Sequence, residues 1–143
     1  NMWIHHDINT ILQNKPQNSL QARADGYPDF LWTLSSQFDK DSENFITLKE
    51  RFNLEIDDYF QTGIMFFDTS IIKKQTKQEI INLAEEYPIS ITNEQGILNL
   101  YFIFEKNIYE DLPVDTNDGL VYFYWLLENK KIYITKQNRT KYK

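Results

Sequence analysis

The chain has 143 residues, of which 41% are hydrophobic and 15% aromatic, so it is long enough and apolar enough for one domain with a buried core. Its net charge of −6 argues against nucleic acid as a partner, because binding phosphates requires clustered Lys and Arg. It contains no cysteine, which excludes disulfides, thiolate metal sites and cysteine nucleophiles.

Neither a membrane-spanning helix nor a secretion signal is visible in the sequence. No apolar run reaches the roughly 20 residues that a transmembrane helix requires, and the first residues lack a signal-peptide pattern. We therefore expect no transmembrane segment and a cytoplasmic location. The basic run at residues 136–143 is expected to be a solvated, frayed tail.

The first part of the chain predicts few regular elements. Residues 2–13 mix apolar and polar side chains, as in a short strand followed by a turn. Residues 14–19 and 23–30 are rich in turn-forming residues and are expected to be loops. Residues 30–34 form an apolar segment whose type the pattern does not decide.

Three later segments have the pattern of a capping box, which predicts the start of a helix. In this pattern a Thr hydroxyl accepts from an amide three residues on, and a Glu or Gln at that position reaches back to the Thr amide. The second of these helices has Ile80, Ala84 and Tyr87 on one face and is expected to end at Pro88. The three pairs are Thr47 with Glu50, Thr76 with Glu79, and Thr92 with Gln95.

Three apolar segments predict strands. Residues 63–67 (GIMFF) are typical of a buried strand, whereas residues 120–127 are either a strand or a short buried helix. Residues 131–135 alternate like a strand, and residues 128–130 can turn between the last two segments. Strands mixed with helices indicate an α/β or α+β fold, with a mixed sheet and flanking helices.

Two polar stretches give the sequence its clearest functional pattern. Residues 59–72 (YFQTGIMFFDTSII), a predicted helix, and residues 93–102 (NEQGILNLYF) follow one another. In type and order they resemble the nucleotide-sugar glycosyltransferases of family 8, which include glycogenin-like and bacterial galactosyltransferase-like enzymes. The family has Asn where this chain has Gln61, and Asp where it has Glu94. The matching residues are Phe60, Gly63, Gln95, Leu98 and Asn99.

The resemblance covers about residues 58–104 and implies a partial GT-A-like fold. The nucleotide-binding half of these enzymes precedes the matching region, so residues 1–143 are expected to form one domain of a larger glycosyltransferase, corresponding to its acceptor-side half. The implied reaction transfers a hexose from a nucleotide sugar, such as a UDP-sugar, to a glycan acceptor in bacterial surface-polysaccharide synthesis. The family usually requires Mn²⁺.

The resemblance also implies roles for individual residues. Glu94 and Gln95 would be catalytic: Glu94 would bind hydroxyls of the donor sugar, and Gln95 would lie closest to the reacting carbon. Fixed oxygen dipoles near that carbon would stabilise an oxocarbenium-like transition state. Substrate binding would involve Gln61, Thr62, Gly63 and Asn99.

The metal site of the family is an Asp-x-Asp triad after a strand, together with a late His. This chain has His5-His6-Asp7 near the corresponding distance from residues 23–30, so His5 and Asp7 are the implied Mn²⁺ ligands, with His in place of the first Asp. Mn²⁺ prefers oxygen ligands but accepts imidazole. The late His is absent, because the only histidines are His5 and His6.

The same residues also have structural interpretations. Gly63 can allow close packing at the start of a strand, Gln95 can complete a capping box with Thr92, and Glu94 favours the positive end of a helix dipole. Two other functions therefore stay open. The chain can be a non-catalytic carbohydrate- or protein-binding module without the nucleotide half, or a small acidic domain whose aromatic residues form a protein interface.

Overall fold

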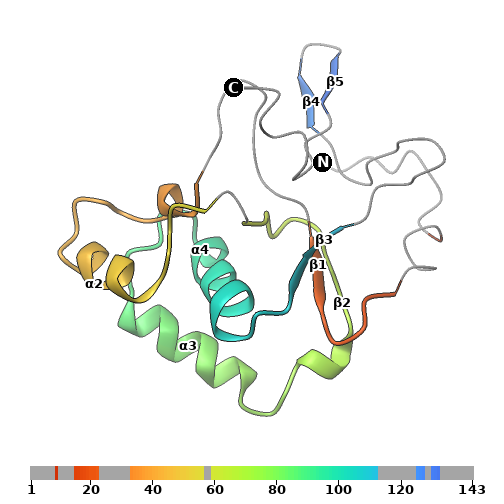
Figure 1. Cartoon of the computed structure of the whole chain (residues 1–143), viewed down its shortest axis with the longest axis horizontal. Coiled ribbons are helices and arrows are strands. Elements are labelled where there is room, and N and C mark those ends of the chain that lie inside the picture. The colour runs from red at the N-terminus through yellow and green to blue at the C-terminus, as the bar shows by residue number, and fades with distance from the viewer. Residues whose placement is uncertain are drawn as a thin grey trace.

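The computed structural model describes residue 9 and residues 15–22, 33–56, 59–112, 125–127 and 130–132. Figure 1 shows helices α2, α3 and α4 gathered to one side of a three-stranded sheet. The arrangement confirms the predicted mixed α/β class. The predicted loop at 23–30 and the basic tail at 136–143 lie outside the described residues, as do residues 2–13 except Asn9, whose backbone is helical rather than extended.

The three-stranded sheet joins segments that lie far apart in the sequence. Its strands are β1 (Leu20–Ala22), β2 (Met65–Phe67) and β3 (Tyr109–Asp111), in the order β2-β1-β3. The central strand β1 is antiparallel to β2 and parallel to β3. Because side chains alternate along a strand, Leu20 and Ala22 share the core face, and both are buried. The sequence pattern did not predict β1.

The strand predicted at residues 63–67 is present as β2, but it is less buried than expected. Met65 and Phe66 are half-buried, and Phe67 is 39% exposed. The reason is the position of β2, which has β1 as its one neighbour in the described sheet.

Residues 125–127 and 130–132 form two paired strands, in the region where the sequence predicts a strand or short helix followed by a strand. Strand β4 (Trp125–Leu127) pairs antiparallel with β5 (Lys130–Ile132), so the segment left open between strand and helix is a strand at residues 125–127. Residues 128 and 129 of the predicted turn lie outside the described residues.

The helical elements lie in the middle of the chain. A 3₁₀ turn η1 (Leu34–Gln37) precedes α2 (Asn44–Arg51), and a second 3₁₀ turn η2 (Thr69–Ile71) precedes α3 (Thr76–Glu86). Helix α4 (Glu94–Asn99) continues without a break into a π-helix, η3 (Leu100–Glu105). Helix α3 ends two residues before Pro88, as predicted.

The first two predicted capping boxes are wrong, although both lie at helices. Helix α2 begins three residues before Thr47, whose hydroxyl donates to the Asn44 carbonyl at 2.9 Å. Helix α3 begins at Thr76, but the Thr76 hydroxyl accepts from the Lys73 amide at 2.9 Å. Glu79 does not complete the box, because the Thr76 amide donates to the Lys73 carbonyl at 3.1 Å; the Glu79 carboxylate accepts from the Tyr101 hydroxyl at 2.6 Å.

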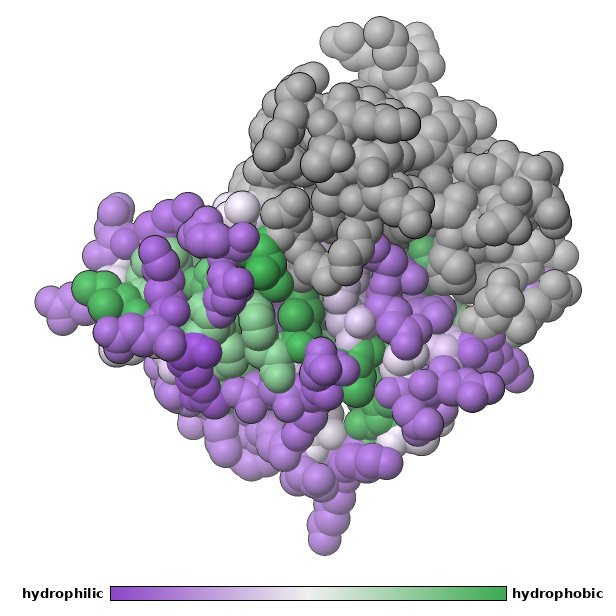
Figure 2. All heavy atoms as spheres, viewed as in Figure 1, coloured by the Kyte–Doolittle hydropathy of each residue, from purple (hydrophilic) through white to green (hydrophobic). Residues whose placement is uncertain are grey.

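The core contains many rings and lies between the helices and the sheet. Phe60 and Tyr59 are completely buried. The ring of Phe60 packs against that of Tyr109 on β3, with centroids 5.0 Å apart, and against that of Phe102 on η3, at 6.5 Å. Figure 2 shows hydrophilic residues over most of the described part of one face, with small apolar areas between them.

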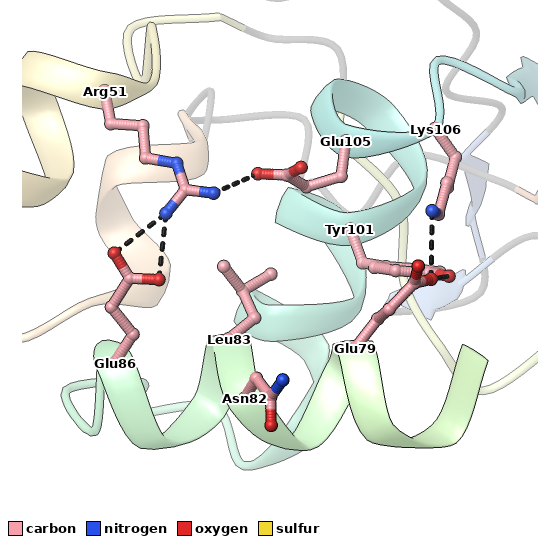
Figure 3. Close-up of a pocket in the computed structure, with 8 residues that line it drawn as sticks. All are labelled: Arg51, Glu79, Asn82, Leu83, Glu86, Tyr101, Glu105 and Lys106. Carbon is pink, nitrogen blue, oxygen red and sulfur yellow. Dashed lines mark hydrogen bonds and ion pairs between the residues drawn. The ribbon is translucent and has the colours of Figure 1, made fainter. Parts of the chain in front are cut away.

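Ion pairs on the surface tie three helical elements together. Arg51 Nη1 donates to both carboxylate oxygens of Glu86 at 2.8 Å, and its Nη2 donates to Glu105 at 2.6 Å (Figure 3). These contacts join α2 to α3 and to η3. Beside them Glu79 accepts from Tyr101 and pairs with Lys106 at 2.9 Å. Hydrogen bonds from Arg51 lower the pKa of Glu86, and those from Tyr101 and then Lys106 lower the pKa of Glu79.

These lowered pKa values predict how stability depends on pH. A carboxylate whose pKa is lower in the folded than in the unfolded state stabilises the fold above its unfolded pKa. That stability is lost as pH falls through the folded pKa. We expect the free energy of unfolding, measured with urea between about pH 7 and pH 3, to fall less steeply in Glu86→Gln and Glu79→Gln than in the original chain.

The matched control is Glu85→Gln, which changes an exposed carboxylate on the same helix. Among the described residues Glu85 makes no ion pair, so this variant should keep the original pH dependence. An equal change of slope in all three variants would contradict the prediction. Added salt should reduce the difference, because exposed ion pairs are screened.

Candidate functional site

The two polar stretches singled out in the sequence meet in the structure. The segment at residues 60–62 lies beside α4, and side chains at positions 94, 95 and 99 of that helix hydrogen-bond to it. Positions 95 and 99 are four residues apart, so they lie on one face of the helix. The geometry therefore brings together Gln61, Thr62, Gly63, Glu94, Gln95 and Asn99.

Asn99 is the buried member of this group. It is completely buried, and its Oδ1 accepts from the Phe60 amide at 2.7 Å. Its Nδ2 donates to the Phe60 carbonyl and to the Gln95 carbonyl, both at 2.8 Å. Both amide hydrogens of Asn99 are thus used within the protein. Asn99 pairs with the backbone of Phe60 as a neighbouring strand would, and so holds the segment at residues 60–62 against α4.

Gln95 holds the next residue of the same segment. Its Oε1 accepts from the Thr62 amide at 3.2 Å, and its Nε2 donates to Oε1 of Gln37 at 2.9 Å. The third predicted capping box is therefore wrong, because the Gln95 side chain turns inward. The Thr92 hydroxyl is buried without a hydrogen-bond partner, and the helix begins at Glu94 with Asn93 before it.

Thr62 binds the side chains of both Glu94 and Gln95. The Thr62 hydroxyl donates to Oε1 of Glu94 at 3.2 Å, while its amide is bound by Gln95. Glu94 is exposed and pairs with no Lys or Arg among the described residues. Its carboxylate can therefore accept further hydrogen bonds from a ligand.

Gln61 carries an acceptor that the protein does not use. Its Oε1 is buried and has no hydrogen-bond partner among the described residues. The side chain lies over Gly63, where an added Cβ would come within 2.8 Å of that oxygen. Gly63 is therefore required for this position of Gln61. An unpaired buried acceptor costs about 1–3 kcal/mol, a cost that a bound hydroxyl or water would offset.

The backbone is strained where α4 begins. Asn93 has φ 53° and ψ −125°, a combination that favours glycine. Its carbonyl accepts from the Ser90 hydroxyl at 2.6 Å, which helps to hold this conformation. The strained residue directly precedes Glu94 and Gln95, and strain of this kind concentrates at functional sites.

Two hollows on the described surface lie away from this group. One, of about 160 Å³, is lined by the ion pairs of Figure 3, whose charged side chains bind one another. The other, of about 230 Å³, adjoins it and shares Glu79, Tyr101 and Lys106. Neither hollow includes Gln61, Thr62, Glu94 or Gln95.

The predicted metal ligands His5 and Asp7 lie outside the described residues. Across the ranges that the structure describes, no group of three or more His, Asp or Glu side chains could hold a metal ion. In the same part of the chain, no helix is both long and apolar enough to cross a membrane.

One residue of the group was missed by sequence reasoning. Gln37 is 2% exposed and binds Gln95, yet it stands 58 positions earlier in the chain. No local pattern connects the two residues. The one signal in the sequence was that Gln37 is a polar residue in a short segment bounded by the apolar residues Leu34 and Phe38. Both of these apolar residues are buried in the structure.

Replacing Asn99 should destabilise the fold. In Asn99→Leu the Phe60 amide and carbonyl lose their partners while they stay buried, so we expect a loss of about 3 kcal/mol in the free energy of unfolding. Urea unfolding measures this change. The control, Asn82→Leu, removes an exposed amide on α3 and should change stability by about 0.5 kcal/mol or less. Equal losses in both variants would contradict the role of Asn99.

Replacing Asn93 by glycine should release strain. Glycine adopts positive φ without a Cβ clash, so we expect Asn93→Gly to raise the free energy of unfolding by about 1 kcal/mol. Asn107, with φ 51°, is a second non-glycine residue with positive φ, so Asn107→Gly is the comparison variant. A lower stability of Asn93→Gly than of the original chain would show that the conformation is not strained.

Comparison of the chain with protein-family models, with curated proteins and with solved structures found no match. The functional interpretation therefore depends on the residues and on their geometry. What the geometry provides is a small polar site. The exposed carboxylate of Glu94 and the amide of Gln95, at one end of α4, both bind Thr62, and the preceding residue is Gln61.

Proposed function

We propose that the chain is part of a glycosyltransferase that transfers a hexose from a nucleotide sugar to a glycan acceptor, in bacterial surface-polysaccharide synthesis. The observation that carries the proposal is the junction of two polar stretches more than 30 residues apart in sequence. At this junction the oxygen of Gln61 has no partner in the part of the chain that the structure describes. Residue patterns resembling family 8 glycosyltransferases lie in both stretches.

The chemistry of the junction suits a sugar. Each sugar hydroxyl both donates and accepts, so a sugar site needs acceptors and donors at fixed positions. Glu94 offers exposed acceptor oxygens, and Gln95 offers an N–H that no described residue uses. The negative charge of Glu94 would also stabilise the positive charge that develops on the sugar during transfer.

Within this proposal Asn99 supports the site rather than touching the substrate. Its amide hydrogens bind the Phe60 and Gln95 carbonyls, and the residue is completely buried. Thr62 has an intermediate role, because its amide and hydroxyl fix Gln95 and Glu94 in place. Gly63 leaves room for the side chain of Gln61.

The donor substrate would be a UDP-sugar, and the proposed metal is Mn²⁺. The imidazole of His5 and the carboxylate of Asp7 are donors that Mn²⁺ accepts. When bound, the ion would neutralise the negative charge of the diphosphate. The residues of the junction itself would bind the sugar and orient it.

One observation favours a second function, a carbohydrate-binding module that does not catalyse transfer. The described residues of the junction include no Lys or Arg, whereas a diphosphate needs positive charge or a metal. A neutral glycan needs neither. The two functions therefore differ in whether binding requires the nucleotide and the metal.

Calorimetric titration with UDP-hexoses, with and without Mn²⁺, tests the proposal. We expect metal-dependent binding that Gln95→Ala weakens about tenfold or more, because one hydrogen-bonding amide is lost. Gln78→Ala, which removes an exposed amide from α3, is the control and should bind like the original chain.

A different result of the titration would support the binding module instead. Binding of a free oligosaccharide without nucleotide or metal, weakened by Gln95→Ala, would replace the transferase by the binding module. Failure of a folded sample to bind either ligand would contradict both functions. Circular dichroism and urea unfolding of the same samples would establish that they are folded.

A further inference from the structure

Gln37 lies behind the candidate site, at the end of η1. It is 2% exposed, so its amide is almost entirely removed from water. The Gln37 backbone carbonyl accepts from the Ile91 amide at 2.9 Å, and its side-chain Oε1 accepts from Nε2 of Gln95 at 2.9 Å. Gln37 therefore binds both Ile91, before α4, and Gln95, in the first turn of α4.

The hydrogen bonds define which way the Gln95 amide faces. The backbone N–H of Thr62 can only donate, so the Gln95 atom beside it must be the carbonyl oxygen Oε1. The Gln95 NH₂ group then faces Gln37, which must present its own oxygen. Gln95 has two amide hydrogens, and Gln37 takes one of them.

We propose that Gln37 is a positioning residue, which holds the Gln95 amide so that the second Nε2 hydrogen is presented to the ligand. Gln95 then meets its ligand as a hydrogen-bond donor, and the ligand atom is an oxygen that accepts. That this oxygen belongs to a sugar rests on the proposed function. The orientation of the amide does not, because it follows from contacts within the protein.

A purely space-filling role would not require Gln at this position. The neighbours Leu34 and Phe38 are apolar and completely or almost completely buried. An apolar side chain of similar length would fill the same volume without the cost of burying an amide. The polar group at position 37 is explained by the partner that it binds.

Nuclear magnetic resonance of the Gln95 side-chain amide tests the orientation directly. Loss of the signal in Gln95→Met identifies it. In the original chain we expect two separate hydrogen signals, of which one is protected from solvent exchange. Gln37→Met, which keeps the length but removes the acceptor, should abolish that protection. Gln37→Glu, which keeps an acceptor oxygen, should retain it.

Titration of the same variants with a UDP-hexose links the orientation to binding. We expect Gln37→Met to bind about tenfold more weakly, and Gln37→Glu to recover most of the affinity. If Gln37→Met is unfolded, the Gln37→Glu comparison carries the test.

The outcomes separate this inference from the proposed function. An unchanged Gln95 amide signal in Gln37→Met would overturn the positioning role. A changed signal with undiminished UDP-hexose binding would also overturn it, because the orientation would then not matter to the ligand. A changed signal in a chain that binds no UDP-hexose would leave the orientation established and contradict the proposed function alone.

Discussion

The buried amide of Asn99 joins α4 to the segment that leads into β2, and the rest of the site depends on this contact. One side chain satisfies both the N–H and the C=O of Phe60, which would otherwise be unpaired in the core. Phe60 in turn packs against Tyr109 on β3 and Phe102 on η3. The Asn99 side chain therefore joins α4, through Phe60, to residues of β3 and η3.

Around this contact the protein has features that destabilise the fold by themselves. The oxygen of Gln61 is buried without a partner among the described residues, and Asn93 has a backbone conformation that favours glycine. Each of these features costs free energy, and a stable core such as the one around Phe60 can compensate for it. Asn93 directly precedes Glu94 and Gln95, and Gln61 precedes Thr62, which both of these side chains bind.

The hollow beside Arg51 is lined by ion pairs that connect helical elements. The charged side chains that line it bind one another, since Arg51 binds Glu86 and Glu105 while Lys106 binds Glu79. The exposed pairs contribute little individually, but together they connect α2, α3 and η3. The candidate site differs, because Glu94 has no cation partner among the described residues.

The sequence by itself determined the mixed fold class, the strands β2 and β5, and the end of α3 before Pro88, because these depend on local patterns of apolar and turn-forming residues. It also singled out the polar stretches that meet at α4. Only the tertiary structure decided the side-chain partners. Thr76 and Gln95 match a capping pattern, yet their side chains bind Lys73 and Gln37 instead. The strand β1 and the role of Gln37 depend on residues more than 40 positions away, and no local pattern records such contacts.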